Sequence, residues 1–228
     1  MATTRKYGDG CAGSHALNLV GERWALLVVR ELLLGPKRFT DLRAGLPDIS
    51  PNVLTQRLLE LEIASVVQRV RLPPPAATWV YRLTPWGQDL EPIVSALGQW
   101  GARSPTLPRG LPLSADSLAL SFRAMFDAAR ADGMLLHVAL RLGEHRFAAT
   151  VCDGRLNLVR GDGDGDGADA TVTADDPGTL AAIAYDGLTL AAAQRDGAVQ
   201  VSGDKAAARR FFTLFTLPPP ASDHFSAL

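Results

Sequence analysis

Apolar residues recur at helical spacing through the first part of the chain and predict a series of short helices. Residues 22–34 are apolar on more than one face and end at a Gly-Pro pair, so this helix is expected inside a domain. Residues 39–44 predict a second short helix, and the turn after it contributes Leu46 and Ile49 to the core. A further helix follows, so the order indicates a helix-turn-helix module.

The stretch that begins at Ser50 has the composition of a capped helix with one apolar and one polar face. Ser50 is a favoured N-cap residue, and Pro51 suits the first helical position, where no backbone N–H is required. The apolar side is expected to hold Val53, Leu54, Leu58 and Leu61, and the polar side Asn52, Thr55, Gln56 and Arg57. These polar groups suit base edges in a major groove, although a surface helix of an unrelated domain would show the same pattern.

Two β-branched and aromatic runs, 66–71 and 78–83, predict a hairpin after this helix, with three prolines in the connection. Arg69 and Arg71 share one strand face because side chains alternate along a strand. If the helix that begins at Ser50 reads bases, the groups around it are expected to contact the DNA backbone or the minor groove. Ser50 is expected on a phosphate, and the other flanking groups are Lys37, Arg38, Thr40, Arg69 and Arg71. Ordinary surface charge is the alternative interpretation of each cation.

Large apolar residues repeat at intervals of four and three between residues 85 and 100, where one continuous helix is expected. The repeat consists of Trp86, Leu90, Ile93, Leu97 and Trp100. Such a seam could pack within its own domain. A two-fold operator nevertheless needs a paired protein, so the seam is assigned to homodimerisation.

The periodicity becomes alternating in the second half of the chain. A helix is expected over 114–130, then antiparallel strands over 136–142, 146–152 and 155–159, joined by an Asp-Gly turn between the last two. Strands at 170–174 and 199–202 and helices over 177–185, 188–194 and 205–215 complete this half. The predicted fold class is α+β: an N-terminal winged helix-turn-helix domain joined to a C-terminal domain with a mostly antiparallel sheet and covering helices.

Charge separates the two halves. The net charge of -1 over 228 residues hides 12 Lys/Arg against 9 Asp/Glu in residues 1–104, and 11 against 15 in residues 105–228. A positive front half fits DNA binding, whereas phosphates would repel an acidic rear half. The proline-rich stretch near residue 105 predicts a linker over 105–113, between domains at 1–104 and 114–228.

Other chemistry has little support in the residue pattern. The histidines and cysteines lack the spacing of metal ligands and no nucleophile motif occurs, so neither an enzyme nor a cofactor or metal site is predicted. The acidic run 161–167 begins like a calcium loop, but Thr173 stands where a bidentate glutamate is needed, so a flexible loop is expected. Without a signal-peptide pattern or a membrane-length apolar run, a cytoplasmic protein is expected.

The front half resembles the HxlR-type winged helix-turn-helix regulators. The matching residues include Cys11, Gly21, Arg23-Trp24, Arg30-Glu31-Leu32, Arg38-Phe39, Leu46-Pro47, Ile49-Ser50, Leu54-Thr55, Arg57-Leu58, Leu61-Glu62 and the run Tyr-Arg-Leu-Thr-Pro-Trp-Gly at 81–87. The resemblance covers about residues 8–101 and implies a homodimer that binds double-stranded operator DNA, with the helix at Ser50 in the major groove. Ala12 departs from the pattern, which often has proline after the N-terminal cysteine.

Residues 114–217 resemble the sterol-carrier-protein-like domain through the order of their elements and through short runs at 169–173 and 199–204. This resemblance implies a twisted antiparallel sheet covered by helices, with an apolar cavity. By analogy, the domain would bind a small hydrophobic effector. The alternative is a filled core that serves dimer contacts.

Three functional hypotheses follow. The first is a homodimeric regulator whose operator binding is modulated by a small apolar effector in the rear domain. The second is a redox-sensing regulator that acts through Cys11, at the start of the first helix, where the helix dipole lowers the pKa of a thiol. The third is a lipid-carrier or enzyme module with a secondary DNA-binding domain. Cys152 closes a predicted strand and is expected in the core.

Overall fold

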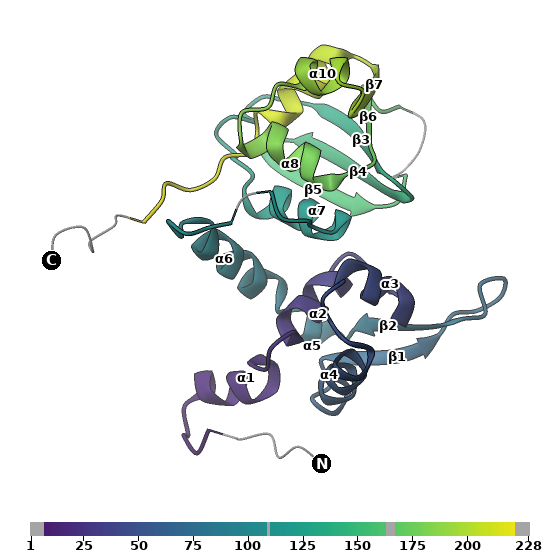
Figure 1. Ribbon diagram of the computed structural model, residues 1–228, viewed down its shortest axis with the longest axis vertical. Coiled ribbons are helices and arrows are strands. Elements are labelled where there is room, and N and C mark those ends of the chain that lie inside the picture. Colours follow the sequence, from purple (N-terminus) through teal and green to yellow (C-terminus); the bar gives the residue numbers. More distant parts are fainter. Residues whose placement is uncertain (1–6, 109, 163–166, 222–228) are drawn as a thin grey trace, which may run out of the picture. The chain divides into compact units, whose positions relative to one another are not determined.

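The computed structural model describes residues 7–108, 110–162 and 167–221 (Figure 1). The chain divides into two compact units, Met1–Val94 and Ser95–Leu228. The linker and the domain limits expected from the sequence stay predictions. The centre of the acidic run at 161–167 lies outside the described residues.

The first unit is a helical module closed by a β-hairpin. Its helices are α1 (Ala12–Val20), α2 (Ala25–Leu32), α3 (Phe39–Gly45), α4 (Pro51–Ile63) and α5 (Pro85–Gln88), and its strands are β1 (Val67–Arg71) and β2 (Trp79–Leu83). The core consists of aliphatic side chains from α2, α3, α4 and the hairpin, among them Val28, Leu32, Leu42, Leu54, Leu58, Leu61 and Val80. Helix α2 is shorter than expected, because Trp24 takes a left-handed backbone conformation and blocks an earlier start.

The hairpin acquires a third partner that the sequence did not predict. Strands β1 and β2 pair antiparallel, with Arg69 opposite Tyr81 and Arg71 opposite Trp79. Lys37 pairs with Tyr81 through two backbone hydrogen bonds of 2.9 and 2.8 Å between their N–H and C=O groups. The segment before α3 is thereby fixed to the sheet.

The single helix expected over residues 85–100 is divided in two, so that prediction was wrong. Helix α5 ends at Gln88, and α6 spans Glu91–Ala102, across the division between the units. The physical reason is Pro92, which has no backbone N–H and whose ring would collide with the carbonyl of residue 88 in a continuous helix.

The second unit is built on a five-stranded sheet with the strand order β5-β4-β3-β6-β7. The strands are β3 (Leu136–Leu142), β4 (His145–Cys152), β5 (Arg155–Arg160), β6 (Ala170–Ala174) and β7 (Val199–Gly203). All pairs are antiparallel except β3 with β6. This confirms the predicted α+β class with a mostly antiparallel sheet.

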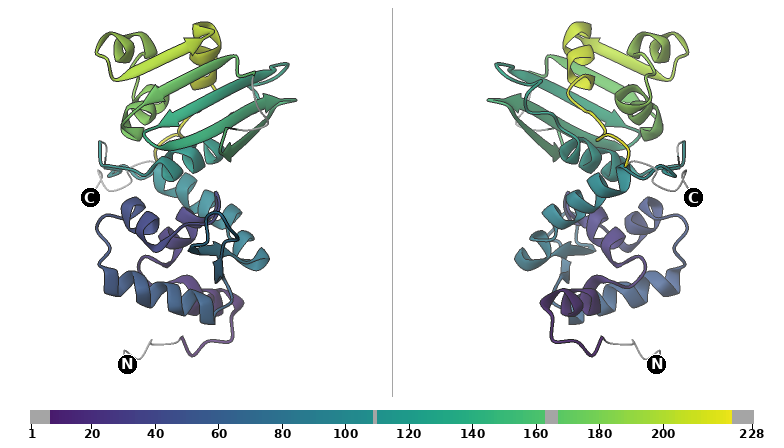
Figure 2. Two further views of the ribbon diagram at one scale, coloured as in Figure 1. Left: turned by 90° about the vertical axis from the view of Figure 1, so that its right-hand side faces the viewer. Right: turned by 90° about the vertical axis from the view of Figure 1, so that its left-hand side faces the viewer.

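Helices pack against this sheet (Figure 2). They are α7 (Ala115–Ala124), α8 (Pro177–Tyr185), α9 (Leu190–Arg195) and α10 (Lys205–Phe212). Burial alternates along β3 and β6, as expected where helices cover one face. Helices α7 and α10 are shorter than predicted because the chain leaves each of them to form a bridge between Phe126 and Phe215.

Aromatic rings fill the space between α7, α10 and the sheet. The Phe122 ring stacks on Phe215 at 4.3 Å between centroids and meets Phe211 edge-on at 5.9 Å. All three side chains are buried, and the Tyr185 hydroxyl lies 2.8 Å from that of Ser121 on the same side. This cluster gives the second unit an apolar core of its own.

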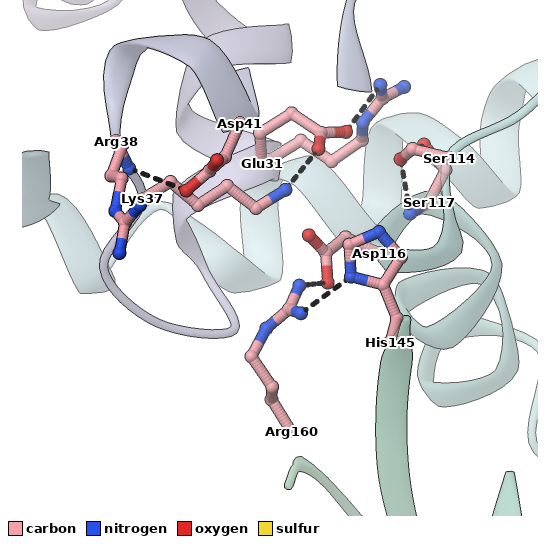
Figure 3. A network of polar contacts seen from close by, with 10 residues as sticks. Glu31, Lys37, Arg38, Asp41, Ser114, Asp116, Ser117, His145 and Arg160 are labelled. Carbon is pink, nitrogen blue, oxygen red and sulfur yellow. Dashed lines mark hydrogen bonds and ion pairs between the residues drawn. The ribbon is translucent and has the colours of Figure 1, made fainter. Parts of the chain in front are cut away.

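A buried ion pair joins α7 to the edge of the sheet. The carboxylate of Asp116, which is 1% exposed, pairs with the guanidinium of Arg160 on β5 (Figure 3). Arg160 also lies 3.1 Å from His145 Nδ1 and over the ring of Phe147. The contacts fix α7 over this end of the sheet.

Candidate nucleic-acid interface

Helix α4 presents a polar surface on a firmly anchored backbone. The Ser50 hydroxyl accepts a hydrogen bond from the N–H of Val53 at 3.3 Å, as an N-cap residue should. Leu54, Leu58 and Leu61 are buried, which fixes the rotation of the helix. Val53 was expected beside them but is 39% exposed, because it lies at the edge of the apolar face. Anchoring from one side leaves the other side of α4 free for recognition.

The predicted base-reading residues have different surroundings. Asn52, Thr55 and Gln56 are exposed. The Thr55 hydroxyl donates to the Pro51 carbonyl at 2.9 Å, and the Gln56 amide donates to Glu60 at 2.7 Å. Asn52 and Thr55 stand in the first turn and a half of α4, where recognition helices commonly meet bases.

Arg57 is held by acidic neighbours. Its side chain is 13% exposed and its Nη1 lies 2.7 Å from Glu60 and 3.5 Å from Glu22. Glu22 is far from α4 in the sequence, so spacing along the helix gave no sign of this pair. The ion pairs give Arg57 a role in fixing Glu60, which in turn holds the Gln56 amide.

A buried charged cluster fixes α3 against α2. Glu31 is fully buried, and its carboxylate lies 2.5 Å from the Lys37 ammonium and 3.0 Å from the Arg30 guanidinium (Figure 3). Gly45 packs over this carboxylate so closely that a Cβ atom would overlap with it. Lys37 was expected to flank the DNA, but it is 7% exposed and serves this cluster. Burial of a cation is tolerated here because a carboxylate compensates it.

Exposed cations remain on either side of α4. Arg38 and Thr40 are exposed at the start of α3, where the Arg38 N–H donates to Asp41 at 3.0 Å. Arg69 and Arg71 are exposed on one face of β1. The Arg69 guanidinium lies 4.8 Å from the centre of the Trp79 ring, and Trp79 is itself 51% exposed. This Arg–Trp pair was missed from the sequence, because the two residues are diagonal neighbours across the hairpin, where Arg69 faces Tyr81 and Trp79 faces Arg71.

The apolar seam assigned to dimerisation is open to solvent. The exposed fractions are 51% for Trp86, 54% for Ile93, 49% for Leu97 and 74% for Trp100, whereas Leu90 is half-buried. Neither α1 nor α6 contains a buried residue. Helices with this much apolar surface are typical of subunit interfaces.

The two cysteines occupy different electrostatic environments. Cys11 is exposed at the N-cap of α1, and the backbone N–H groups of Gly13 and Ser14 lower the pKa of its thiol by hydrogen bonding to the sulfur. Cys152 is also exposed, so its predicted place in the core was wrong: its neighbour Val151 takes the inward position of β4. A hydrogen bond and the negative charge of Asp153 raise the pKa of Cys152.

Within residues 7–108, 110–162 and 167–221, no group of three or more His, Cys, Asp or Glu side chains is arranged to hold a metal ion. Nor does any helix in these ranges combine the length and apolar character that crossing a membrane requires.

An anchored reading helix beside a cation-bearing hairpin defines a winged helix-turn-helix protein. Comparison with known proteins agrees: the pattern of the HxlR-like helix-turn-helix family matches residues 19–106. The chain is 39% identical to the HTH-type transcriptional regulator YvaP of Bacillus subtilis, over 37% of its own length and 79% of that protein. It is 36% identical to YodB of the same organism, over 37% and 76%. The chain belongs to the HxlR-like family.

A solved structure also resembles part of the chain. The sec-alkylsulfatase Pisa1 from a Pseudomonas species is 26% identical over 49% of this chain, with a TM-score of 0.43. The match spans only 18% of that enzyme. A likeness of this extent carries no argument about activity.

Proposed function

We propose that the protein is a homodimeric transcriptional regulator that binds double-stranded operator DNA through α4 and the β1–β2 hairpin. The observation that carries the proposal is the exposed polar face of α4 on a helix whose other face is buried. Asn52, Thr55 and Gln56 are the base readers, with Arg57 as the residue that holds Gln56 in place through Glu60.

Backbone contacts come from the flanking groups. Ser50 lies at the positive end of α4, which favours a phosphate, and Arg38 with Thr40 lies at the start of α3. Arg69 and Arg71 extend the contact along the hairpin, where the Arg69 guanidinium lies over the Trp79 ring. Such contacts set the register on the duplex and add little sequence preference.

Dimerisation is supported by the open apolar faces of α1 and α6. Ile93, Leu97 and Trp100 lie along one side of α6, and Leu17 on α1 is 52% exposed. Two copies related by a two-fold axis would bury these side chains and present two α4 helices to a pseudo-palindromic operator. In this proposal the second unit holds a small effector that shifts the dimer between DNA-competent and incompetent arrangements.

Variants of the two contact classes test the DNA-binding part. An operator selected from random duplexes is titrated with the wild type, Asn52→Ala and Arg71→Gln at several salt concentrations. Asn52→Ala should change the preferred sequence and weaken operator binding by about 1–3 kcal/mol. Arg71→Gln should weaken all duplexes alike and flatten the salt slope by about one.

The matched control is Arg209→Gln, an exposed arginine of the second unit that should change neither quantity. Equal effects of Asn52→Ala and Arg71→Gln would contradict the assignment of base and backbone contacts. Failure to select any preferred operator at physiological salt would contradict the regulator itself and favour a module with only secondary DNA binding.

A second candidate function is redox sensing through Cys11, favoured by its exposure and by the lowered pKa of its thiol. Operator binding is titrated with hydrogen peroxide in the wild type and in Cys11→Ser, with Cys152→Ser as control. A response lost only in Cys11→Ser supports this function. The same response in all three proteins excludes it.

A further inference from the structure

The second unit contains an open groove of about 730 Å³. The proposed contacts with DNA do not involve this groove. One wall is the C-terminal part of α6 with the residue that follows it, contributing Ala96, Gln99, Trp100 and Arg103. The groove is also lined by residues 124–129, from the last residue of α7 onward, and by residues 216–219. All of these residues belong to the unit Ser95–Leu228.

Hydrogen bonds between the lining segments hold the groove in shape. The Gln99 amide donates to the carbonyl of Ala124 at 2.7 Å, and the Thr216 N–H donates to that of Met125 at 3.1 Å. Arg103 holds the C-terminal segment at two points. Its Nε donates to the Pro219 carbonyl at 3.3 Å, and its own carbonyl accepts from the N–H of Ala221 at 2.8 Å.

The lining favours a flat apolar molecule. Trp100 is 74% exposed, so an indole face is available for stacking, and Pro218 and Pro219 add rigid apolar surface beside it. Met125 and Phe126 also line the groove. The buried rings of Phe122, Phe211 and Phe215 do not line this groove, so the groove is separate from the aromatic cluster.

The charged lining adds a preference for an anion. Asp127 is already engaged, because its carboxylate pairs with Arg130 at 3.2 Å and accepts the Ala129 N–H at 3.0 Å. Arg103 forms no ion pair within the described ranges, and only its Nε is used by Pro219. Its terminal nitrogens can therefore bind an oxyanion in two-pronged geometry.

We propose that this groove is the effector site, and that it takes an aromatic molecule bearing a carboxylate or sulfonate. The ring would stack on Trp100, and the acid group would pair with Arg103. The inference rests on the proposed function only in calling the ligand an effector, because the groove itself lies outside the DNA-binding unit.

Helix α6 supplies the coupling. Ile93, Leu97 and Trp100 lie on one side of this helix, while Ala96 and Arg103 lie on the neighbouring side that lines the groove. Trp100 belongs to both sides. A ligand stacked on Trp100 therefore has different contacts when a second copy covers the seam and when it does not, and this difference is what shifts a dimer equilibrium.

The test uses two probes with related aromatic systems, the anion 1-anilinonaphthalene-8-sulfonate and the neutral N-phenyl-1-naphthylamine. Each is titrated by fluorescence against the full chain in the wild type, Arg103→Gln and Trp100→Leu. Arg103→Gln should weaken binding of the anion about fivefold and leave the neutral probe unchanged, as expected for one exposed ion pair. Trp100→Leu should weaken both probes about tenfold.

Arg209→Gln and Leu135→Ala are the matched controls, since both residues are exposed and lie outside the groove and the dimer seam, and neither should change the affinity of either probe. Equal loss of the anion in Arg103→Gln and Arg209→Gln would overturn the proposal, as would a wild type that binds both probes equally. A further outcome is that the wild type is a dimer that binds neither probe, whereas Trp100→Leu is a monomer that binds both. This result would show that a second copy covers the groove, and it would also overturn the proposal.

Operator binding is measured separately, without probe, so the two proposals fail independently. If the anion binds in an Arg103-dependent way but the chain selects no operator, the groove stands as a binding site and the proposed regulator function fails. If operator binding is specific but has the same affinity with and without saturating anion, the ligand of the groove is not an effector.

Discussion

Cys11 and Cys152 are both exposed, but their surroundings move the pKa of the two thiols in opposite directions. A lowered pKa increases the thiolate fraction at neutral pH, and the thiolate is the nucleophile. Cys11 should therefore react with iodoacetamide faster than Cys152 at pH 7. Its rate should level off at a lower pH than that of Cys152.

Peptide mass spectrometry after timed alkylation reports both sites in one sample, so each cysteine serves as the other's control. The difference should shrink only at a pH above the raised pKa of Cys152, where both thiols are ionised. A Cys152 that reacts as fast as Cys11 at pH 7 would show that the hydrogen bonds from Gly13 and Ser14 do not act on the sulfur.

Gly87 and Gly98 differ in how much space surrounds the position of a Cβ atom, so alanine substitutions at the two sites should have different effects on stability. A Cβ atom on Gly87 would overlap with the backbone carbonyl oxygen of Val66, and the backbone cannot yield as a flexible side chain would. Gly87→Ala should lower the free energy of unfolding by about 1–3 kcal/mol. Gly98 lies inside α6 with no atom near its Cβ position, so Gly98→Ala should be neutral or stabilise by up to about 1 kcal/mol.

Urea unfolding followed by circular dichroism measures both variants under the same conditions. A Gly87→Ala protein as stable as the wild type would mean that α5 and the start of β1 can move apart at little cost.

The ion-pair partners of Lys37 and Arg57 show what could not be predicted from single residues in the sequence. Lys37 was expected beside the DNA because it precedes the first helix of the motif, and Arg57 was expected to read bases because it falls on the polar side of the second. Each instead meets a carboxylate brought in by the fold, Glu31 for Lys37 and Glu22 with Glu60 for Arg57. Only the helical pair between Arg57 and Glu60 was visible in the spacing.

Helix α6 contains no buried residue, and Ile93, Leu97 and Trp100 are all exposed along it. Leu97 lies at the middle of its seam. Leu97→Glu should dissociate the proposed dimer, because the interface would then have to bury an unpaired carboxylate. Sedimentation velocity at micromolar concentration should then show a monomer.

Leu135→Glu is the matched control, since Leu135 is 68% exposed and lies outside the helices of the second unit. The fold of both variants is checked by circular dichroism. A Leu97→Glu protein that sediments as the wild-type dimer would move the dimer contact away from α6.

Element types were largely predictable, whereas their ends were not. Alternation identified β3, β4 and β6, because a sheet covered on one face imposes a period of two. The ends of α2, α7 and α10 depend on tertiary contacts or unusual backbone angles, which local pattern does not contain. The break before α6 was readable in principle from Pro92, but the regular apolar spacing masked it.

At the scale of the whole molecule, each unit has a core of its own. Phe122→Ala removes the ring on which the aromatic cluster of the second unit is centred, and it should cost that unit about 3–5 kcal/mol. Hydrogen exchange should become faster in β3 and β4 and stay unchanged in α4. Equal loss of protection in both units would show that they unfold as one.

The sequence showed a charge difference between the two halves of the chain and indicated the family through its motif. It did not indicate the groove at the end of α6. The groove depends on Arg103 meeting a segment more than a hundred residues further along the chain, and neither periodicity nor a motif reports such a meeting.

The strand order has a consequence for synthesis of the chain. Strand β3 is the first of its sheet to leave the ribosome, yet it lies in the middle, and one of its edges is completed only by β6. Until residues 170–174 emerge, that edge offers unpaired amides and carbonyls to any neighbouring extended chain. A product truncated after β5 should therefore aggregate or be degraded, and the N-terminal unit would be lost together with it.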